Sequence, residues 1–75
     1  MERYKNLGGN SSVIGFDINS DSIVVYFSDG TIYLYSYISA GSNNIEEMKS
    51  LAQKGQGLNH YIMTNVRFKY EKKLR

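Results

Sequence analysis

The feature that most constrains this fold is an Asp-Gly pair between two apolar runs. Residues 23–27 read "IVVYF" and residues 31–37 read "TIYLYSY", with Asp29-Gly30 between them. β-Branched and aromatic residues of this kind favour strands. An Asp-Gly pair is typical of a two-residue hairpin turn, because both central positions of that turn need a positive φ. We therefore predict an antiparallel hairpin at the centre of the fold.

A two-residue turn also predicts which side chains share each face of the hairpin, because side chains alternate along a strand. Phe27 would lie opposite Ile32, and Tyr26 opposite Tyr33. The aliphatic face would carry Ile23, Val25, Phe27, Ile32 and Leu34. The tyrosine-rich face would carry Val24, Tyr26, Tyr33 and Tyr35, with Tyr37 in line. Neither face is charged, so we expect cover on both faces, or a binding surface on one.

The flanking segments complete the predicted fold. Residues 13–18, "VIGFDI", alternate like a further strand. Residues 44–54 predict a helix with an apolar stripe, ended by Gly55 in the left-handed conformation. "GLNHYIMTNV" suits a short second helix, and residues 66–70 suit an extended strand. We expect an α+β fold: a three-stranded antiparallel meander packed with a central helix, and a C-terminal short helix plus extended segment that closes the other face.

The length of 75 residues indicates a single domain. We expect residues 1–10 to be a loose lead-in, residues 11–70 to form the domain and residues 71–75 to form a basic tail. The chain has no cysteine, and therefore no disulfide or thiolate metal site. It lacks both an apolar run of about 20 residues that would span a membrane and the apolar region of a signal peptide. A cytoplasmic location is expected by elimination.

The charge of the chain is unevenly distributed. The net charge is +2, but residues 66–75 hold five basic residues and one acidic residue. Such asymmetry suggests an anionic partner. The alternative is a solvated end that only keeps the protein soluble.

The sequence offers no constellation for catalysis or metal binding. His60 is the only histidine, and no nucleophile with an orienting acid accompanies it in a recognisable motif. Asp17, Asn19 and Asp21 begin like a calcium loop, but serine stands where that loop needs its glycine and its bidentate glutamate. We therefore expect a non-enzymatic protein without a cofactor, a metal or an evident small-molecule substrate.

An ordered series of residues resembles the KTSC domain family. The series comprises Ser11-Ser12, Ile14-Gly15-Phe16-Asp17, Ile23, Val25, Phe27, Gly30, Tyr33 and Tyr35, then a helix, then Gly55, Asn59 and Ile62. The resemblance covers about residues 11–70. KTSC domains are small modules named after the C-terminus of some lysyl-tRNA synthetases, and they also stand alone as short bacterial or phage proteins. The resemblance therefore implies contact with RNA.

Two functions of different classes follow. Tyrosines on a sheet beside basic residues would stack the bases of single-stranded RNA, with Arg67 and Lys69 on one side of an extended segment. The alternative is a protein-interaction module or small homodimer that uses the tyrosine face or an exposed edge of "IVVYF". Both hypotheses that use the tyrosine face fail if Tyr26, Tyr33 and Tyr35 are buried within one chain. The candidate nucleic-acid-binding residues are Tyr33, Tyr35, Asn59, His60, Arg67 and Lys69.

Overall fold

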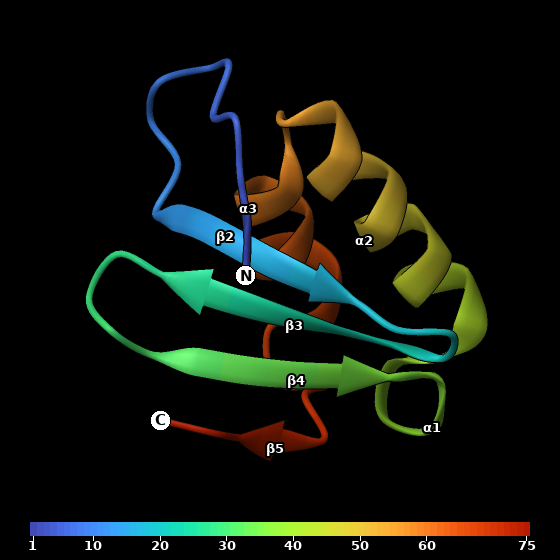
Figure 1. Cartoon of the computed structure of the whole chain (residues 1–75). Coiled ribbons are helices and arrows are strands. Elements are labelled where there is room, and N and C mark those ends of the chain that lie inside the picture. The colour runs from blue at the N-terminus through green and yellow to red at the C-terminus, as the bar shows by residue number, and fades with distance from the viewer.

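The computed structural model describes all 75 residues and has one antiparallel sheet with helices on one side (Figure 1). The strands, in their order across the sheet, are β1 (Glu2–Arg3), β2 (Val13–Ile18), β3 (Ser22–Phe27), β4 (Ile32–Ser36) and β5 (Lys72–Lys73). The helices are α1 (Tyr37–Ala40), α2 (Ser42–Lys54), α3 (Leu58–Tyr61) and the π-helix η1 (Ile62–Val66). The α+β class is confirmed, but the sheet has five strands rather than three, because a two-residue strand is added at each edge of the meander.

The loop of the β3–β4 hairpin contains three residues, not two. The Gly30 N–H donates to the Phe27 carbonyl oxygen at 3.0 Å, and the Phe27 N–H donates to the Thr31 carbonyl oxygen at 2.9 Å. Gly30 has φ +93°, as the last residue of a three-residue hairpin loop requires. The Asp29 carboxylate closes the loop, since it accepts from both the backbone N–H and the hydroxyl of Thr31.

The extra loop residue shifts the register by one position and reverses the faces of β4. Tyr33 lies opposite Val25, and Ile32 lies opposite Tyr26. Because a one-residue shift moves every side chain of a strand to the other face, the predicted faces are wrong. Tyr33 and Tyr35 share a face with Val25, whereas Tyr26 lies on the other face.

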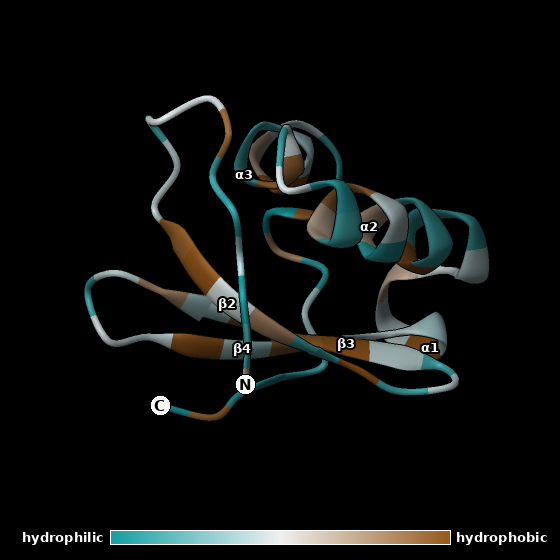
Figure 2. Cartoon of the chain, turned by 45° about the horizontal axis from the view of Figure 1, so that its top comes forward, coloured by the Kyte–Doolittle hydropathy of each residue, from teal (hydrophilic) through white to brown (hydrophobic).

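The core lies between the first of these faces and the helices (Figure 2). The largest fully buried side chains are Val13, Phe16, Ile23, Val25 and Tyr35 from the sheet, and Ile45, Met48, Leu58, Ile62 and Val66 from the helical segments. The expectation that the C-terminal segment would cover the opposite face is therefore wrong. The α3–η1 segment packs beside α2, because Leu58, Ile62 and Val66 all point into the same core.

The C-terminal segment also differs from its prediction. Val66 ends η1, and residues 67–71 form no strand. The alternation of Val66 and Phe68 predicts that both lie on one face of a strand, but Val66 is buried as the last residue of η1 and Phe68 is 80% exposed. Extended structure resumes only at β5, where the Leu74 N–H donates to the Ile32 carbonyl oxygen at 2.7 Å. The basic tail is thus an edge of the sheet.

The first ten residues are tied to the fold rather than loose. β1 pairs with β2. Tyr4 is buried, and its hydroxyl accepts from the Leu58 N–H at 3.2 Å. The Leu7 N–H donates to the carbonyl oxygen of Gly55 at 2.8 Å, and Gly55 ends α2 in the predicted left-handed conformation. No helix reaches the length and hydropathy that crossing a bilayer requires.

Replacing Gly30 by valine tests the hairpin loop. A Cβ at Gly30 would meet no atom within 4 Å, so the substitution strains only the backbone at φ +93°. We expect a loss of about 1–2 kcal/mol in the free energy of unfolding, the cost of a left-handed conformation for a residue with a Cβ. Urea denaturation measures it. Gly8→Val is the control, because Gly8 has equal space and no positive φ; equal losses from both variants would contradict this loop.

Met48→Ala tests the packing of α2 on the sheet. Met48 is fully buried at the centre of the helix face, so we expect its truncation to cost about 2–5 kcal/mol of unfolding free energy. Ser50→Ala, at an exposed position of the same helix, should change stability by less than about 0.5 kcal/mol. Thermal and urea melts of the two variants check the assignment, which a small effect of Met48→Ala would refute.

Candidate functional site

An open groove of about 450 Å³ lies between the β3–β4 hairpin and the segment that runs from α3 past η1. Tyr33 and Tyr35 line it from β4, Asn59 lines it from α3, and Arg67 and Phe68 line it from the residues after η1. Four of the six predicted site residues therefore converge here, although 24 positions separate Tyr35 from Asn59. The groove is the place in the fold where most of the predicted nucleic-acid-binding residues meet.

The tyrosines of β4 divide into a buried and a half-buried member. Tyr35 is 2% exposed and belongs to the core, so it offers no face for stacking. Tyr33 is half-buried and lies at the centre of an aromatic cluster. Its ring centroid is 4.7 Å from that of Tyr70, 5.9 Å from that of Phe27 and 6.3 Å from that of Tyr35. The row of tyrosines is mainly structural, and only its outer end borders the groove.

Phe68 is the most exposed aromatic residue of the groove, and it is not among the candidates predicted from the sequence. Its side chain is 80% exposed. The Arg67 guanidinium carbon lies 5.3 Å from the centroid of its ring, within the range of a cation–π contact. The strand pattern assigned Phe68 to the covering of the sheet. Its position between Arg67 and Lys69 was the signal that pointed to a surface role.

The π-helix η1 shapes the wall of the groove. Ile62 and Val66 point from it into the core, while Met63 lines the groove. The wider turn of a π-helix displaces carbonyl groups from their usual partners. Here the Thr64 hydroxyl donates to the His60 carbonyl oxygen at 2.9 Å. The Asn65 amide donates in the same way to the Tyr61 carbonyl oxygen. Short π-helices are rare in proteins as a whole, and many of those that do occur lie at functional sites.

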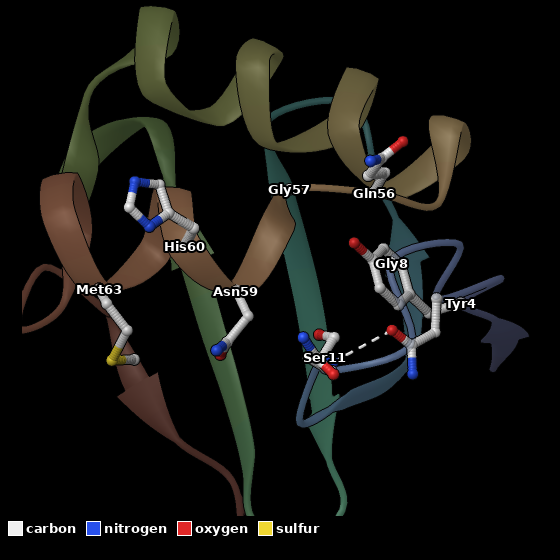
Figure 3. A pocket seen from close by; sticks show the side chains of 10 residues that line it. Tyr4, Gly8, Ser11, Gln56, Gly57, Asn59, His60 and Met63 are labelled. Carbon is white, nitrogen blue, oxygen red and sulfur yellow. Dashed lines mark hydrogen bonds between the residues drawn. The ribbon is translucent and has the colours of Figure 1, made fainter.

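A second, more polar pocket of about 320 Å³ lies beside the groove (Figure 3). Asn59 and His60 line it from α3, and Asn6 and Ser11 line it from the N-terminal segment. The Ser11 N–H donates to the Asn6 side-chain oxygen at 3.1 Å. Figure 3 shows the His60 ring turned in a different direction from Asn59 and Met63. Asn59 thus borders both pockets, whereas His60 lies outside the groove.

Asn59 is held in a fixed orientation at the boundary of the two pockets. The Ser12 hydroxyl donates to its side-chain oxygen at 3.1 Å. This bond leaves the Asn59 Nδ2 group without a hydrogen-bond partner in the protein. Because Ser12 and Asn59 both line the groove, the amide can donate to a ligand there.

The C-terminal segment, which forms one side of the groove, holds five of the nine basic residues of the chain. The two ion pairs of the chain join Met1 to Asp17 and Lys49 to Glu46, so none of the C-terminal basic residues is neutralised in this way. Those basic residues are all exposed: Arg67, Lys69, Lys72, Lys73 and Arg75.

Only part of this positive charge borders the groove itself. Arg67 lines the groove, but Lys69 does not, and the two do not share an extended segment as expected. The groove also contains Asp29. Bonds from the Thr31 backbone N–H and then the Thr31 hydroxyl hold the pKa of that carboxyl below its usual value, with a smaller contribution from Lys73.

Comparisons of the chain with protein-family models, curated proteins and solved structures give no match. No group of three or more acidic or histidine side chains converges in a way that would hold a metal ion. The groove, its aromatic cluster and the basic residues beside it are therefore the features that bear on function.

Ionisation of Tyr35 tests its burial beneath the groove. Burial, followed by the neighbouring Tyr33 and Tyr70, raises its pKa from 10.0 to about 12. The unfolded chain releases this proton near pH 10 and the folded chain keeps it to about pH 12. The contribution to stability is therefore present below pH 10 and lost as the pH rises to about 12. We expect Tyr35→Phe to lose less stability than the wild type between pH 10 and 12 in urea melts. Parallel pH profiles of the two proteins would contradict this burial.

Proposed function

We propose that this chain is a small non-enzymatic binding module, similar to KTSC domains, that binds single-stranded RNA weakly in the groove. The observation that carries the proposal is the exposed Phe68 ring beside Arg67, at the opening of a groove lined by Tyr33 and Asn59. Exposed rings next to cations are what single-stranded nucleic acids need, because bases stack on the rings and phosphates attract the cations.

Phe68 is the main stacking surface in this proposal. Its ring is free on the solvent side, whereas Tyr70 packs on Tyr33 and presents less surface. Base–aromatic stacking contributes about 1–3 kcal/mol for each base. Tyr70 packs on Tyr33 and Tyr35 of β4. This cluster holds the segment that carries Phe68 against the sheet. The surface on which bases would stack is therefore Phe68, and not the row of β4 tyrosines that the sequence suggested.

The phosphates would meet Arg67, with Lys69 and Lys73 nearby. Lys73 pairs with Tyr33 across β4 and β5, so it projects from the same face of the sheet as that ring. Each phosphate contact contributes about −0.7 to the log–log slope of affinity against salt on single strands. Two or three contacts give a slope of about −1.4 to −2.1, and a Kd in the micromolar range or weaker at physiological salt.

The polar groups of the groove would provide little sequence preference. The Asn59 Nδ2 group can donate to a base carbonyl, but uracil, cytosine and guanine all carry such an acceptor. Stacking itself accepts every base. The proposal of a non-enzymatic module is supported by the surroundings of His60, since no carboxylate lines its pocket and a catalytic histidine usually needs an orienting acid.

A second candidate function is association with another protein. The edge of "IVVYF" is not available for it, because β3 lies in the middle of the sheet with partners on both sides. The predicted tyrosine face does not exist as one surface, because Tyr33 and Tyr35 lie on the side of the helices and Tyr26 lies on the opposite side. The observation that favours association is instead the opposite face of the sheet, which no helix covers (Figure 2).

Fluorescence anisotropy with a labelled, mixed-sequence single-stranded RNA tests the RNA proposal. Phe68→Ala should weaken binding by about 5- to 150-fold, the equivalent of one stacked base, without changing the salt slope. Arg67→Ala should weaken binding and reduce the steepness of the slope by about 0.7. Both measurements need a titration at low salt and a series of salt concentrations.

Two matched variants serve as controls. Ile38→Ala removes a 94% exposed apolar side chain from α1, and Lys54→Ala removes an exposed cation at the end of α2. Neither residue lines the groove, so both variants should bind RNA like the wild type apart from a small general charge effect. The proposal fails if about 50 µM protein at low salt shows no binding, or if the controls lose as much affinity as the groove variants.

A further inference from the structure

The sheet face opposite the helices is apolar at its centre, and no helix covers it. The Met1 side chain lies against Gly15 at the β2 end of this face. The inference drawn from this face does not depend on the RNA proposal. Val24, Tyr26, Ile32 and Leu34 project from the two central strands on this side, and each is only half-buried. In Figure 1 the strands lie in front of the α3–η1 segment, and the N-terminal segment crosses in front of β2. An antiparallel sheet with one solvated face normally carries polar residues there. An exposed apolar patch at the centre of a sheet therefore indicates an interaction surface.

The strand register places a charged residue at each end of this patch. Asp17 pairs with Val24, Val24 with Leu34, and Leu34 with Lys72. Paired residues project from the same face of a sheet. One row across four strands therefore runs from a carboxylate through two apolar side chains to an ammonium group.

The negative end of the row is fixed in position. Asp17 accepts a hydrogen bond from the hydroxyl of Tyr26, and its other oxygen lies 3.2 Å from the N-terminal ammonium of Met1. The bond from Tyr26 lowers the pKa of Asp17, so its carboxylate stays charged at neutral pH. The side chain is still 39% exposed, and each carboxylate oxygen can accept a further donor.

The row is complementary to itself in one orientation. If two copies meet face to face about a twofold axis parallel to the strands, the row of one copy runs opposite to the row of the other. Lys72 of each copy then meets Asp17 of its partner, and Val24 and Leu34 pack at the centre. A twofold axis across the strands would instead place Asp17 over Asp17 and Lys72 over Lys72. The charge pattern therefore selects the first geometry.

We propose that the chain forms a weak symmetric homodimer through this face, with Val24, Tyr26, Ile32 and Leu34 at its centre and two Asp17–Lys72 pairs at its rim. A twofold interface uses the same patch on both copies, so the patch must be complementary to itself. The row from Asp17 to Lys72 meets this requirement. Association through the sheet edges is disfavoured, because short edge strands such as β1 and β5 offer little backbone to pair with.

The size of the face indicates a weak dimer. Four strands about 4.8 Å apart, with about six residues of 3.3 Å each, cover roughly 400 Å² per copy. Two copies bury roughly 800–1,000 Å², which lies below the usual range for stable complexes. A Kd in the range of tens to hundreds of micromolar is therefore expected, and the monomer of 8.6 kDa dominates in dilute solution.

Analytical ultracentrifugation of the full chain tests the dimer, over about 5 µM to 1 mM protein to cover this range of Kd. The mean mass should rise towards twice 8.6 kDa as concentration increases. Leu34→Glu should weaken self-association at least tenfold, because it places a charge at the centre of the interface. Lys72→Asp should weaken it about tenfold through repulsion with Asp17. The reversed pair, Asp17→Lys with Lys72→Asp, should restore most of the loss.

Lys73→Asp is the matched control, because Lys73 neighbours Lys72 on β5 but projects from the opposite face. It should leave self-association unchanged. Circular dichroism melts must show that each variant is folded at the temperature of the measurement. A monomeric wild type across the whole concentration range overturns the proposal. Equal weakening by Lys72→Asp and Lys73→Asp, or no restoration by the reversed pair, overturns the proposed geometry.

Discussion

The arrangement of the whole molecule depends on the length of the loop between β3 and β4. Three residues, closed by Gly30 and by the bonds of Asp29 to Thr31, place Tyr33 and Tyr35 on the same side as the aliphatic residues of β3. The apolar surface on that side of the sheet is then so large that α2 and the α3–η1 segment are both needed to bury it. The remaining residues of β4 are left on a face with no helix, so the groove and the uncovered face have one origin.

Local patterns predicted most of the elements of this fold. The runs at residues 13–18 and 23–27 alternate like strands, and the stripe of α2 has helical spacing, so the meander, the main helix and its Gly55 cap were visible in the sequence. The loop length was not, because an Asp-Gly pair fits both a two-residue loop and the end of a three-residue loop. The choice depends on packing across the whole sheet, which no short window contains.

The candidate site shows the same division between local and distant information. Residue types and the ordered series of positions in the sequence selected Tyr33, Asn59 and Arg67, and these do meet in the groove. Phe68 was missed because its alternation with Val66 predicted a strand. Val66 instead ends the helix η1 and is buried in the core. β5 was missed because two lysines carry no strand signal; backbone pairing with β4 holds them. That pairing also separates the charges of the tail, since adjacent lysines of β5 project towards opposite sides of the sheet.

The π-helix has a consequence for how a groove of this kind changes during evolution. A π-helix differs from an α-helix by one residue added to a turn. Losing that residue would leave Ile62 anchored in the core, but it would rotate everything after it by about 100°. Arg67 and Phe68 would then turn away from the groove, while α2 and the strands that precede η1 stayed in place. The length of this segment, more than the identity of its residues, would separate a descendant that keeps the site from one that keeps only the fold.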